Sequence, residues 1–350
     1  MSYHMKNNVI GLEGIDFVEF VEFNKSHSGA DSLDRLFREL GFSKVARHAH
    51  RQIECYQQNQ ITFLVNSEAG SFGNSFFEKH GPSISAMGWR FQDPKRAYEI
   101  AVSRGARPCL EGDYRDSRGN PIPAIFGIGD SLIYFVGAGE TLGFEKLQDP
   151  TLVPDKGFVL IDHLTNNVFK GTMQEWANFY KTVFEFEEVR YFDIRGQKTG
   201  LTSYALRAPG GQFCIPINEA DEAKSQINEY LEEYKGPGIQ HLAFLTKDLI
   251  RSIQLLQDTS IKTLDIASDY YRSVFERVPQ VKEDRSQIER LNILVDGDDG
   301  GYLLQIFTKN LVGPIFLELI QRENHLSFGE GNFQALFDSI ERDQMKRGVL

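Results

Sequence analysis

The stretches GPSISAMGW at 81–89 and GPGIQHLAF at 236–244 align with each other without a gap. Each begins with a Gly-Pro turn, continues as an apolar run typical of a strand, and leads into a helical pattern. An internal repeat is one structural unit used more than once. The chain is therefore predicted to use the same architecture in its two halves.

The repetition extends in both directions from this pair. Strand patterns open the halves at 15–20 and 161–164, and further strand patterns follow at 132–135 and 303–307. Each half also has an amphipathic helix with apolar residues at i, i+3, i+4 and i+7: Leu33, Leu36, Phe37 and Leu40, then Trp176, Phe179, Tyr180 and Val183. The order strand, helix, several strands predicts an α+β fold with two barrel-like domains, each a curved sheet around a cavity.

Local signals suggest how the halves begin and end. The segment 141–157 carries Pro150 and Pro154 among polar residues, which is typical of a linker. We therefore expect an N-terminal domain at 9–145 and a C-terminal domain at 146–350. Thr172 and Glu175 predict a capping box at the start of the second amphipathic helix.

Composition excludes several classes of function. A net charge of -11 argues against nucleic-acid binding, which needs clustered Lys and Arg. The three cysteines Cys55, Cys109 and Cys214 are far apart and odd in number, which predicts buried thiols without disulfides in a reducing compartment. No run approaches the roughly 18 apolar residues that a membrane helix requires. We expect a cytoplasmic protein that does not bind membranes.

The two halves differ at positions that carry chemistry. Phe17 in the first half stands where the second half has His163, and Ala86 stands where the second half has His241. Two imidazoles on strands of one curved sheet can point into its cavity and share a metal ion. Glu318 is the best candidate for a third ligand, because a carboxylate within an apolar strand is costly unless it is paired or bound to metal.

Two imidazoles and one carboxylate leave open positions on one face of a divalent iron, which suits a chelating substrate and O2. Zinc would instead favour a closed tetrahedron or one open position. The alternative is structural: His163 and His241 are ordinary buried histidines, and Glu318 is paired with an arginine such as Arg322. The residues by themselves leave both interpretations open.

Five segments in the same order resemble 4-hydroxyphenylpyruvate dioxygenase: PINE at 216–219 followed by KSQI at 224–227, GIQHLA at 238–243, LQIFT at 304–308, IFLELIQR at 315–322, and FGEGNF at 328–333. The resemblance covers nearly the whole chain and is strongest from 158 to 340. It implies the vicinal oxygen chelate fold, which is related to glyoxalase and built from repeated βαβββ modules, with a C-terminal helix over the active site.

The resemblance also implies a reaction. One Fe(II) per chain would be held by His163, His241 and Glu318, and the partners would be 4-hydroxyphenylpyruvate and O2. Oxidative decarboxylation, ring hydroxylation and side-chain migration would give homogentisate and CO2, as in tyrosine and phenylalanine catabolism. Members of the family form homodimers or homotetramers.

The family's substrate pocket maps onto two groups of residues. The polar group, which would bind substrate or take part in catalysis, comprises Ser203, Asn218, Gln226, Gln240 and Gln305. Uncharged amides and hydroxyls suit a phenol. Three of them also have a local alternative: a strand-exit turn for Asn218, a backbone contact for Ser203 and an exposed helix face for Gln226.

The apolar group would form aromatic walls and comprises Phe316, Phe328, Phe333 and Phe337. Phe333, Leu336, Phe337 and Ile340 lie at helical spacing behind the cap-type Asn332, a pattern that also fits simple helix packing. The family implies that this helix is a lid, with Gly329 and Gly331 letting the loop before it bend.

Two other candidate sites are set aside. The stretch DGDDGG at 296–301 lacks a full calcium-loop pattern and is predicted to be a hairpin turn. His325 precedes the final helix, but no sequence signal places it in the site.

Ala220 and Glu330 depart from the family pattern, which commonly has Pro and Lys there. Two rival functions remain. One is 4-hydroxymandelate synthase, which uses the same substrate and scaffold, although Pro216, Asn218 and Phe337 favour ring hydroxylation. The other is a non-catalytic module that binds a small aromatic ligand.

Overall fold

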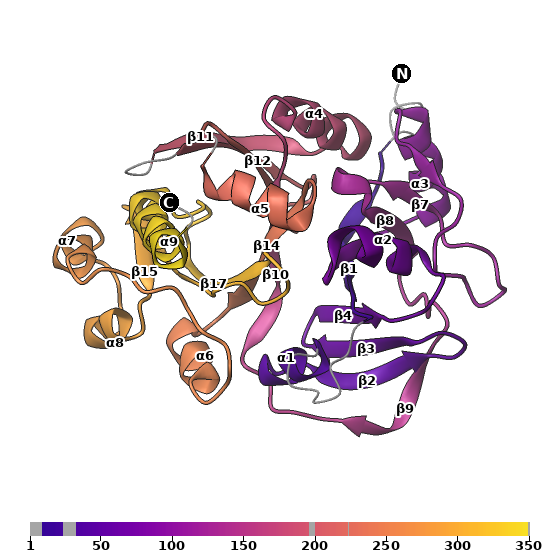
Figure 1. The fold of residues 1–350 in the computed structure, drawn as a ribbon, viewed down its shortest axis with the longest axis horizontal. Coiled ribbons are helices and arrows are strands. Elements are labelled where there is room, and N and C mark those ends of the chain that lie inside the picture. Colours follow the sequence, from indigo (N-terminus) through magenta and orange to yellow (C-terminus); the bar gives the residue numbers. More distant parts are fainter. Residues whose placement is uncertain (1–8, 24–32, 196–199, 223, 349–350) are drawn as a thin grey trace.

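The computed structural model describes residues 9–23, 33–195, 200–222 and 224–348. It contains two curled sheets side by side, one from each half of the chain (Figure 1). The first half contains β1 (Leu12–Val21), α1 (Leu33–Glu39), β2 (Ser43–His48), β3 (Ile53–Gln58), β4 (Ile61–Asn66), α2 (Phe72–His80), β5 (Ser83–Phe91), α3 (Pro94–Ser103), β6 (Pro108–Cys109), β7 (Ala124–Phe126), the 3-10 turn η2 (Ile128–Asp130), β8 (Leu132–Gly137) and β9 (Phe144–Thr151).

The second half repeats this arrangement and adds a terminal helix. It contains β10 (Phe158–Asn167), α4 (Met173–Phe184), β11 (Glu187–Arg195), β12 (Gly200–Arg207), β13 (Cys214–Ala220), α5 (Gln226–Tyr234), β14 (Gly238–Thr246), α6 (Leu249–Leu256), α7 (Tyr270–Arg277), α8 (Arg285–Arg290), β15 (Leu294–Asp298), β16 (Gly301–Phe307), β17 (Phe316–Glu323), the 3-10 turn η3 (Glu330–Asn332) and α9 (Phe333–Arg347).

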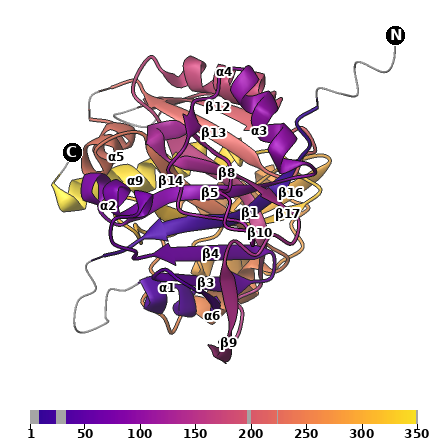
Figure 2. The ribbon, with the colours of Figure 1, turned by 90° about the vertical axis from the view of Figure 1, so that its right-hand side faces the viewer.

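The predicted βαβββ module occurs twice in each half. The four copies start at β1, β5, β10 and β14, and in the last copy α6, α7 and α8 occupy the helical position. The strand order is β6-β7-β8-β5-β1-β4-β3-β2-β9 in the first sheet and β11-β12-β13-β10-β14-β17-β16-β15 in the second. Figure 2 shows β8, β5, β1, β4 and β3 following one another across the first sheet. The α+β fold of two barrel-like sheets is confirmed.

The strand registers agree with the alignment of the two halves. The first strands of successive modules pair antiparallel at the centre of each sheet, with Phe17 opposite Gly88 and His163 opposite Ala243. Two residues along each strand, Glu19 pairs with Ala86 and Thr165 pairs with His241. Phe17 and Ala86 thus occupy the places of His163 and His241.

Two local predictions were wrong. Part of the expected linker 141–157 forms β9, which pairs with β2 at the edge of the first sheet. Pro150 is compatible with an edge strand, where a missing backbone N–H costs no ladder bond. The capping box at Thr172 does not form, because the Thr172 hydroxyl donates to the Phe169 carbonyl instead. The carboxylate of Glu219 accepts from the backbone N–H groups of Gly171 and Met173 at that helix start.

A shared aromatic core joins the two halves. Trp89 of the first sheet is fully buried, with ring centroids 4.7 Å from Phe184 and 5.3 Å from Phe213 of the second half. Because each half buries apolar surface against the other, the second sheet has a rigid support on one side. The division at 145/146 stays a prediction, since β9 extends the first sheet to Thr151.

The remaining bulk predictions can be compared with the described residues. No helix among them combines the length and apolar character needed to cross a membrane. All three cysteines are free thiols, but only Cys55 is buried, whereas Cys109 and Cys214 are partly exposed.

Candidate metal centre

Three adjacent strands bring His163, His241 and Glu318 together. In the pairing of β10, β14 and β17, His163 lies opposite Ala243, and Ala243 lies beside Glu318 in one row across the sheet. His241 lies two residues along β14 from Ala243, opposite Thr165, and therefore on the same face. The small side chain of Ala243 leaves space between His163 and Glu318, which flank it. Sequence positions 163, 241 and 318 therefore converge because of strand register.

The three side chains are buried, and one potential ligand atom from each lies within 4.8 Å of the others. The Oε2 atom of Glu318 is 3.1 Å from Nε2 of His163 and 3.5 Å from Nε2 of His241. Within the described part of the chain, this is the group of His, Cys, Asp and Glu residues with the geometry of a metal site.

The electrostatics of the group suit a carboxylate ligand. Burial would raise the pKa of Glu318, but the charge of His163 and hydrogen bonds from both histidines hold it at about 2. Burial disfavours the charged form of His163, yet Glu318 and Asp162 raise its pKa to about 9. Burial lowers the pKa of His241. Glu318 is therefore an anion at neutral pH in a site that also holds two imidazoles.

Hydrogen bonds orient both imidazoles with Nε2 toward Glu318. Nδ1 of His163 lies 2.8 Å from Oδ2 of Asp162, and Nδ1 of His241 lies 3.1 Å from Oε1 of Gln240. Because these oxygen atoms accept hydrogen bonds, each Nδ1 carries a proton. A metal ion would bind at Nε2, and at His163 it would displace the second proton that the raised pKa keeps on the ring without metal. The sequence analysis did not identify Asp162, although it directly precedes His163.

The alternative pairing of Glu318 with Arg322 is absent. Arg322 instead makes a two-pronged contact with Asp162, with Nε to Oδ1 and Nη2 to Oδ2 both at 2.8 Å. The Oε1 atom of Glu318 is buried and has no hydrogen-bond partner among the described residues. A buried carboxylate oxygen without a partner is costly in a protein interior, and a cation at this point would satisfy it.

The cavity beside the three ligands contains nearly all of the predicted pocket. Its lining comprises His163, Thr165, Phe192, Leu201, Ser203, Pro216, Asn218, Gln226, Gln240, His241, Phe307, Phe316, Glu318, Phe328, Phe333, Leu336, Phe337 and Ile340. All predicted site residues except Gln305 are in this set. Their individual roles stay predictions.

The polar residues of the cavity come from different elements. Ser203 of β12 lies opposite Asn218 of β13, and Asn218 is inside its strand, so the predicted alternative of a strand-exit turn is wrong. The Asn218 amide donates to Oδ1 of Asn167 at 3.4 Å. Gln226 is the first residue of α5 and faces the cavity, so the exposed-face alternative is also wrong.

Gln305 is not among the lining residues of the cavity. It is fully buried on β16, two residues before the lining residue Phe307, and its amide has no hydrogen-bond partner among the described residues. A Cβ added at Gly329 would lie 2.4 Å from Oε1 of Gln305, so the loop before α9 covers this amide. The resemblance alone does not reveal that cover.

Aromatic rings surround the ligands. The Phe316 ring stacks on His241 with centroids 4.8 Å apart, and the Phe328 ring meets the edge of His163 at 5.6 Å. Phe192, which the sequence analysis missed, packs against Phe333 at 5.3 Å. It lies on β11, where no local pattern distinguishes cavity-facing residues from others.

The C-terminal helix α9 lies across the open side of the curled second sheet (Figure 1). The apolar stripe of α9 lines the cavity with Phe333, Leu336, Phe337 and Ile340. The same residues therefore pack the helix against the domain and cover the site. Asn332 is not a side-chain cap; its Oδ1 accepts from the Tyr270 hydroxyl at 2.7 Å. A lid function for α9 stays a prediction.

The candidates set aside from the sequence lie outside this cavity. Residues 296–301 span the end of β15 and the start of β16, with only Asp299 and Gly300 between the paired Asp298 and Gly301, as expected for a hairpin turn. His325 lies with Nδ1 3.5 Å from Oδ1 of Asp298 and does not line the cavity.

Comparison with known proteins identifies the family. Residues 6–142 match the family described as "Hydroxyphenylpyruvate dioxygenase, HPPD, N-terminal", and residues 160–304 match the "Glyoxalase/Bleomycin resistance protein/Dioxygenase superfamily". The chain is 41% identical over 349 residues to the 4-hydroxyphenylpyruvate dioxygenase of Legionella pneumophila subsp. pneumophila, covering 98% of each chain. The chain belongs to the 4-hydroxyphenylpyruvate dioxygenase family.

Two further similarities cover almost the whole chain. "Protein MelA" of Shewanella colwelliana is 53% identical over 350 residues, covering 98% of this chain and 99% of that protein. A solved mutant of 4-hydroxymandelate synthase from Streptomyces coelicolor superposes with a TM-score of 0.82 at 24% identity, covering 95% of this chain and 99% of that chain. The latter similarity shows the shared fold alone.

The 4-hydroxyphenylpyruvate dioxygenase family implies a non-haem iron, and the residues present fit one. Two neutral imidazole nitrogens and one carboxylate form the donor set that leaves a face of ferrous iron open. The partnerless Oε1 of Glu318 provides the structural test, because a bound cation would compensate this buried anion.

Proposed function

We propose that this chain is an Fe(II)-dependent dioxygenase that converts 4-hydroxyphenylpyruvate and O2 into homogentisate and CO2. One ferrous ion per chain would be held by His163, His241 and Glu318. The observation that supports this most directly is the buried convergence of these three side chains, with Nε2 of each histidine facing one carboxylate. All three ligands come from the proposed catalytic domain at 146–350.

The bound ferrous ion would supply Lewis acidity and open coordination positions for a chelating keto acid and O2. The lack of a cationic side chain among the described lining residues supports chelation of the substrate's carboxylate by the metal. The described lining residues include no Lys or Arg, so the metal would be the cationic partner of that carboxylate. The keto-acid end of the substrate would therefore lie at His163, His241 and Glu318, and the phenol would lie farther from them.

The protein's own side chains would hold the phenol and exclude water. Ser203, Asn218, Gln226 and Gln240 offer uncharged donors and acceptors around the cavity. The aromatic rings of Phe316, Phe328, Phe333 and Phe337 would bury the substrate ring and keep bulk water from the reacting atoms.

Ring hydroxylation is preferred to side-chain hydroxylation because of three lining residues. Pro216, Asn218 and Phe337 resemble the homogentisate-forming members of the superfamily, and all three line the cavity. The alternative product is 4-hydroxymandelate.

The test is product identification. Protein loaded anaerobically with Fe(II) would be given 4-hydroxyphenylpyruvate and O2, with oxygen uptake followed in parallel. Homogentisate and 4-hydroxymandelate are isomers, so chromatography against both standards must accompany mass spectrometry. Homogentisate is expected. 4-Hydroxymandelate would overturn the product assignment, and iron-loaded protein that binds the keto acid without turnover would indicate a binding module.

A further inference from the structure

A buried ion pair lies directly behind His163. Arg322 of β17 contacts both oxygens of Asp162 of β10, and only 14% of the Asp162 side chain and 13% of the Arg322 side chain are exposed. Two parallel charge-assisted bonds fix the carboxylate in one orientation. The same Oδ2 atom of Asp162 accepts from Nδ1 of His163 at 2.8 Å. Arg322 thereby determines where the acceptor for this imidazole lies.

The other end of the Arg322 guanidinium holds the loop before α9. Nη1 of Arg322 donates to the backbone carbonyls of His325 at 3.0 Å and Ser327 at 2.6 Å. The next residue is Phe328, whose ring touches His163. The Arg322 guanidinium therefore bonds both to Asp162, which supports His163, and to the backbone of the loop before α9.

We propose that Asp162 and Arg322 are positioning residues that couple the orientation of His163 to the conformation of the loop 325–328. A lysine could not replace Arg322 in this role, because a single ammonium group lacks the rigid fork that reaches a carboxylate and two carbonyls at once. The inference rests on the proposed function in one respect, namely that His163 is a metal ligand.

The coupling works in both directions. Metal bound to His163 would fix the imidazole, and the imidazole would in turn fix Asp162 and Arg322. A fixed Arg322 favours the loop conformation in which the carbonyls of His325 and Ser327 accept its hydrogen bonds. By thermodynamic linkage, disturbing the loop weakens metal binding by the same factor. Loss of a hydrogen-bond partner behind a metal ligand typically reduces metal affinity about 10–100-fold.

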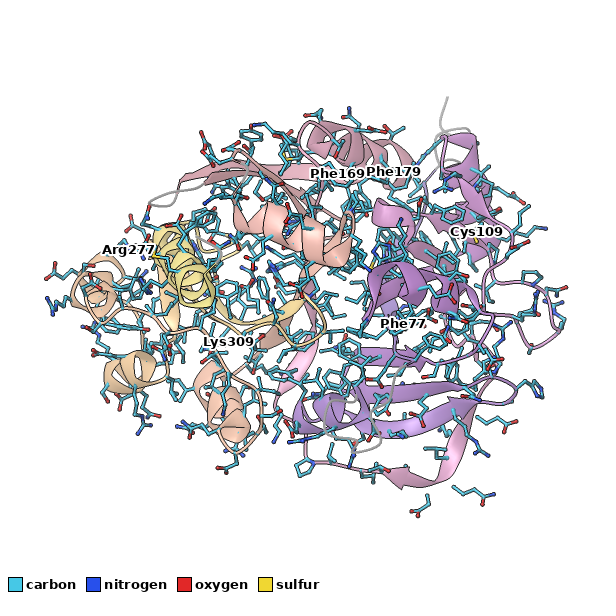
Figure 3. The ribbon with its side chains drawn as sticks, in the orientation of Figure 1. Phe77, Cys109, Phe169, Phe179, Arg277 and Lys309 are labelled. Atoms are coloured by element: carbon cyan, nitrogen blue, oxygen red, sulfur yellow. The ribbon has the colours of Figure 1, made fainter. Side chains whose placement is uncertain are left out.

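A second arginine at the same loop provides a matched control. Arg277, at the end of α7 (Figure 3), donates from Nη2 to the Val295 carbonyl at 3.0 Å and pairs through Nη1 with Asp296. Asp296 in turn accepts from the Gly331 backbone N–H at 2.9 Å. This ion pair anchors the other end of the loop and has no contact with His163 among the described residues.

The experiment compares Arg322→Lys with Arg277→Lys. Fe(II) affinity is measured anaerobically by equilibrium dialysis, and hydrogen exchange of the loop amides is measured with and without Fe(II). We expect Arg322→Lys to weaken Fe(II) binding about 10–100-fold and to lose the protection of loop amides that Fe(II) gives the wild type. Arg277→Lys should loosen the Gly331 end of the loop and change affinity less than twofold.

Asp162→Asn gives a second, independent variant. The amide oxygen can still accept from His163, but the charge that holds Arg322 is lost, so metal affinity should fall in the same range. Adding Arg322→Lys to Asp162→Asn should cause little further loss if the two act as one unit. Asp162→Asn alone keeps the inference testable if Arg322→Lys does not fold.

Unchanged Fe(II) affinity in Arg322→Lys would overturn the inference, as would an equal loss in Arg277→Lys, which would mean general loosening of the loop. Additive losses in the double variant would also overturn it. None of these readouts uses turnover. The product formed by the wild type tests the proposed function separately, and a wild type that makes 4-hydroxymandelate would leave the coupling intact.

Discussion

Replacing Gly329 by alanine should loosen the loop before α9 and displace Gln305 beneath it. Gly329 has φ 78° and ψ 43°, the left-handed conformation. An added Cβ would lie 2.4 Å from Oε1 and 2.5 Å from Nε2 of Gln305. Since Gln305 is fully buried, the clash is relieved only if its amide shifts or if the loop lifts away.

Two costs contribute to the effect. A left-handed alanine costs about 1–2 kcal/mol, and overpacking a filled interior costs about 1–3 kcal/mol. Gly348→Ala isolates the first cost, because Gly348 has φ 77° and ψ 22° and an added Cβ there meets nothing within 4 Å. The clash alone is thus expected to shift the opening equilibrium of the loop by about 1–3 kcal/mol, or roughly 5–150-fold.

Hydrogen exchange resolves the loop amides. The N–H of Gly331 donates to Asp296 at 2.9 Å, and the N–H of Asn332 donates to the Gly329 carbonyl at 2.8 Å, so both exchange only when the loop opens. Relative to wild type, both amides should be accelerated roughly 5–150-fold more in Gly329→Ala than the Gly348 amide, which donates to the Met345 carbonyl at 3.1 Å, is accelerated by left-handed strain alone in Gly348→Ala. The KM for 4-hydroxyphenylpyruvate should rise as well. Equal acceleration in the two variants would show that Gln305 does not support the loop.

Three further predictions follow from the site and from the first sheet. Glu318→Gln keeps the side-chain volume but removes the negative charge of the proposed ligand. Fe(II) affinity, measured by equilibrium dialysis, should therefore fall by more than about 100-fold, which exceeds the loss typical of a residue that only supports a ligand. A smaller loss would show that Glu318 is not a metal ligand. The Phe337 side chain is 3% exposed, so Phe337→Ala should lower the free energy of unfolding, measured in urea, by about 3–5 kcal/mol. The variant should also consume more oxygen than it forms product. Equal oxygen uptake and product formation would mean that this ring does not exclude water. Burial, then the neighbouring Asp113, raises the pKa of Glu19 from 4.5 to about 7, so the folded protein keeps a proton that the unfolded chain releases. As pH rises from 4.5 to about 7, the free energy of unfolding of the wild type should therefore fall by on the order of 3 kcal/mol relative to that of Glu19→Gln. If urea unfolding gave the same pH dependence for both proteins, the raised pKa of Glu19 would be contradicted.

The modules could be predicted from the sequence because their signals are local. The helical spacing around Phe37 and the strand pattern at 15–20 arise from neighbouring residues and need no knowledge of the partner strand. The strand β9 could not be predicted in this way. Its polar residues pair with the free edge of β2, and only the folded sheet reveals that this edge is available.

The candidate ligands could be located because their chemistry conflicts with their surroundings. A carboxylate such as Glu318 in an apolar strand needs a partner, and that need is visible in the sequence. The pairing of Asp162 with Arg322 could not be predicted, because the two residues are 160 positions apart and either could satisfy other partners. The cover over Gln305 likewise depends on a distant loop, whose path follows from tertiary packing.

The structure also explains why one half holds the proposed metal site and the other does not. In the first sheet, Phe17 lies opposite Gly88, and Gly88 lies beside Tyr134, so Tyr134 occupies the place of Glu318. The Phe17 ring lies directly over Gly88, where an added Cβ would come within 2.2 Å of it. The Tyr134 and Tyr114 rings pack against Phe17 with centroids at 6.1 Å and 5.3 Å.

Aromatic packing thus fills the volume that the second sheet keeps for its ligands. The three corresponding positions in the first half hold Phe17, Ala86 and Tyr134, none of which is a metal ligand of the second half's type. Introducing histidines at 17 and 86 alone would leave two tyrosine rings where a cation needs space and would put no carboxylate at position 134. A metal site in this half would require a change at Tyr134 as well, because strand register places the third ligand there.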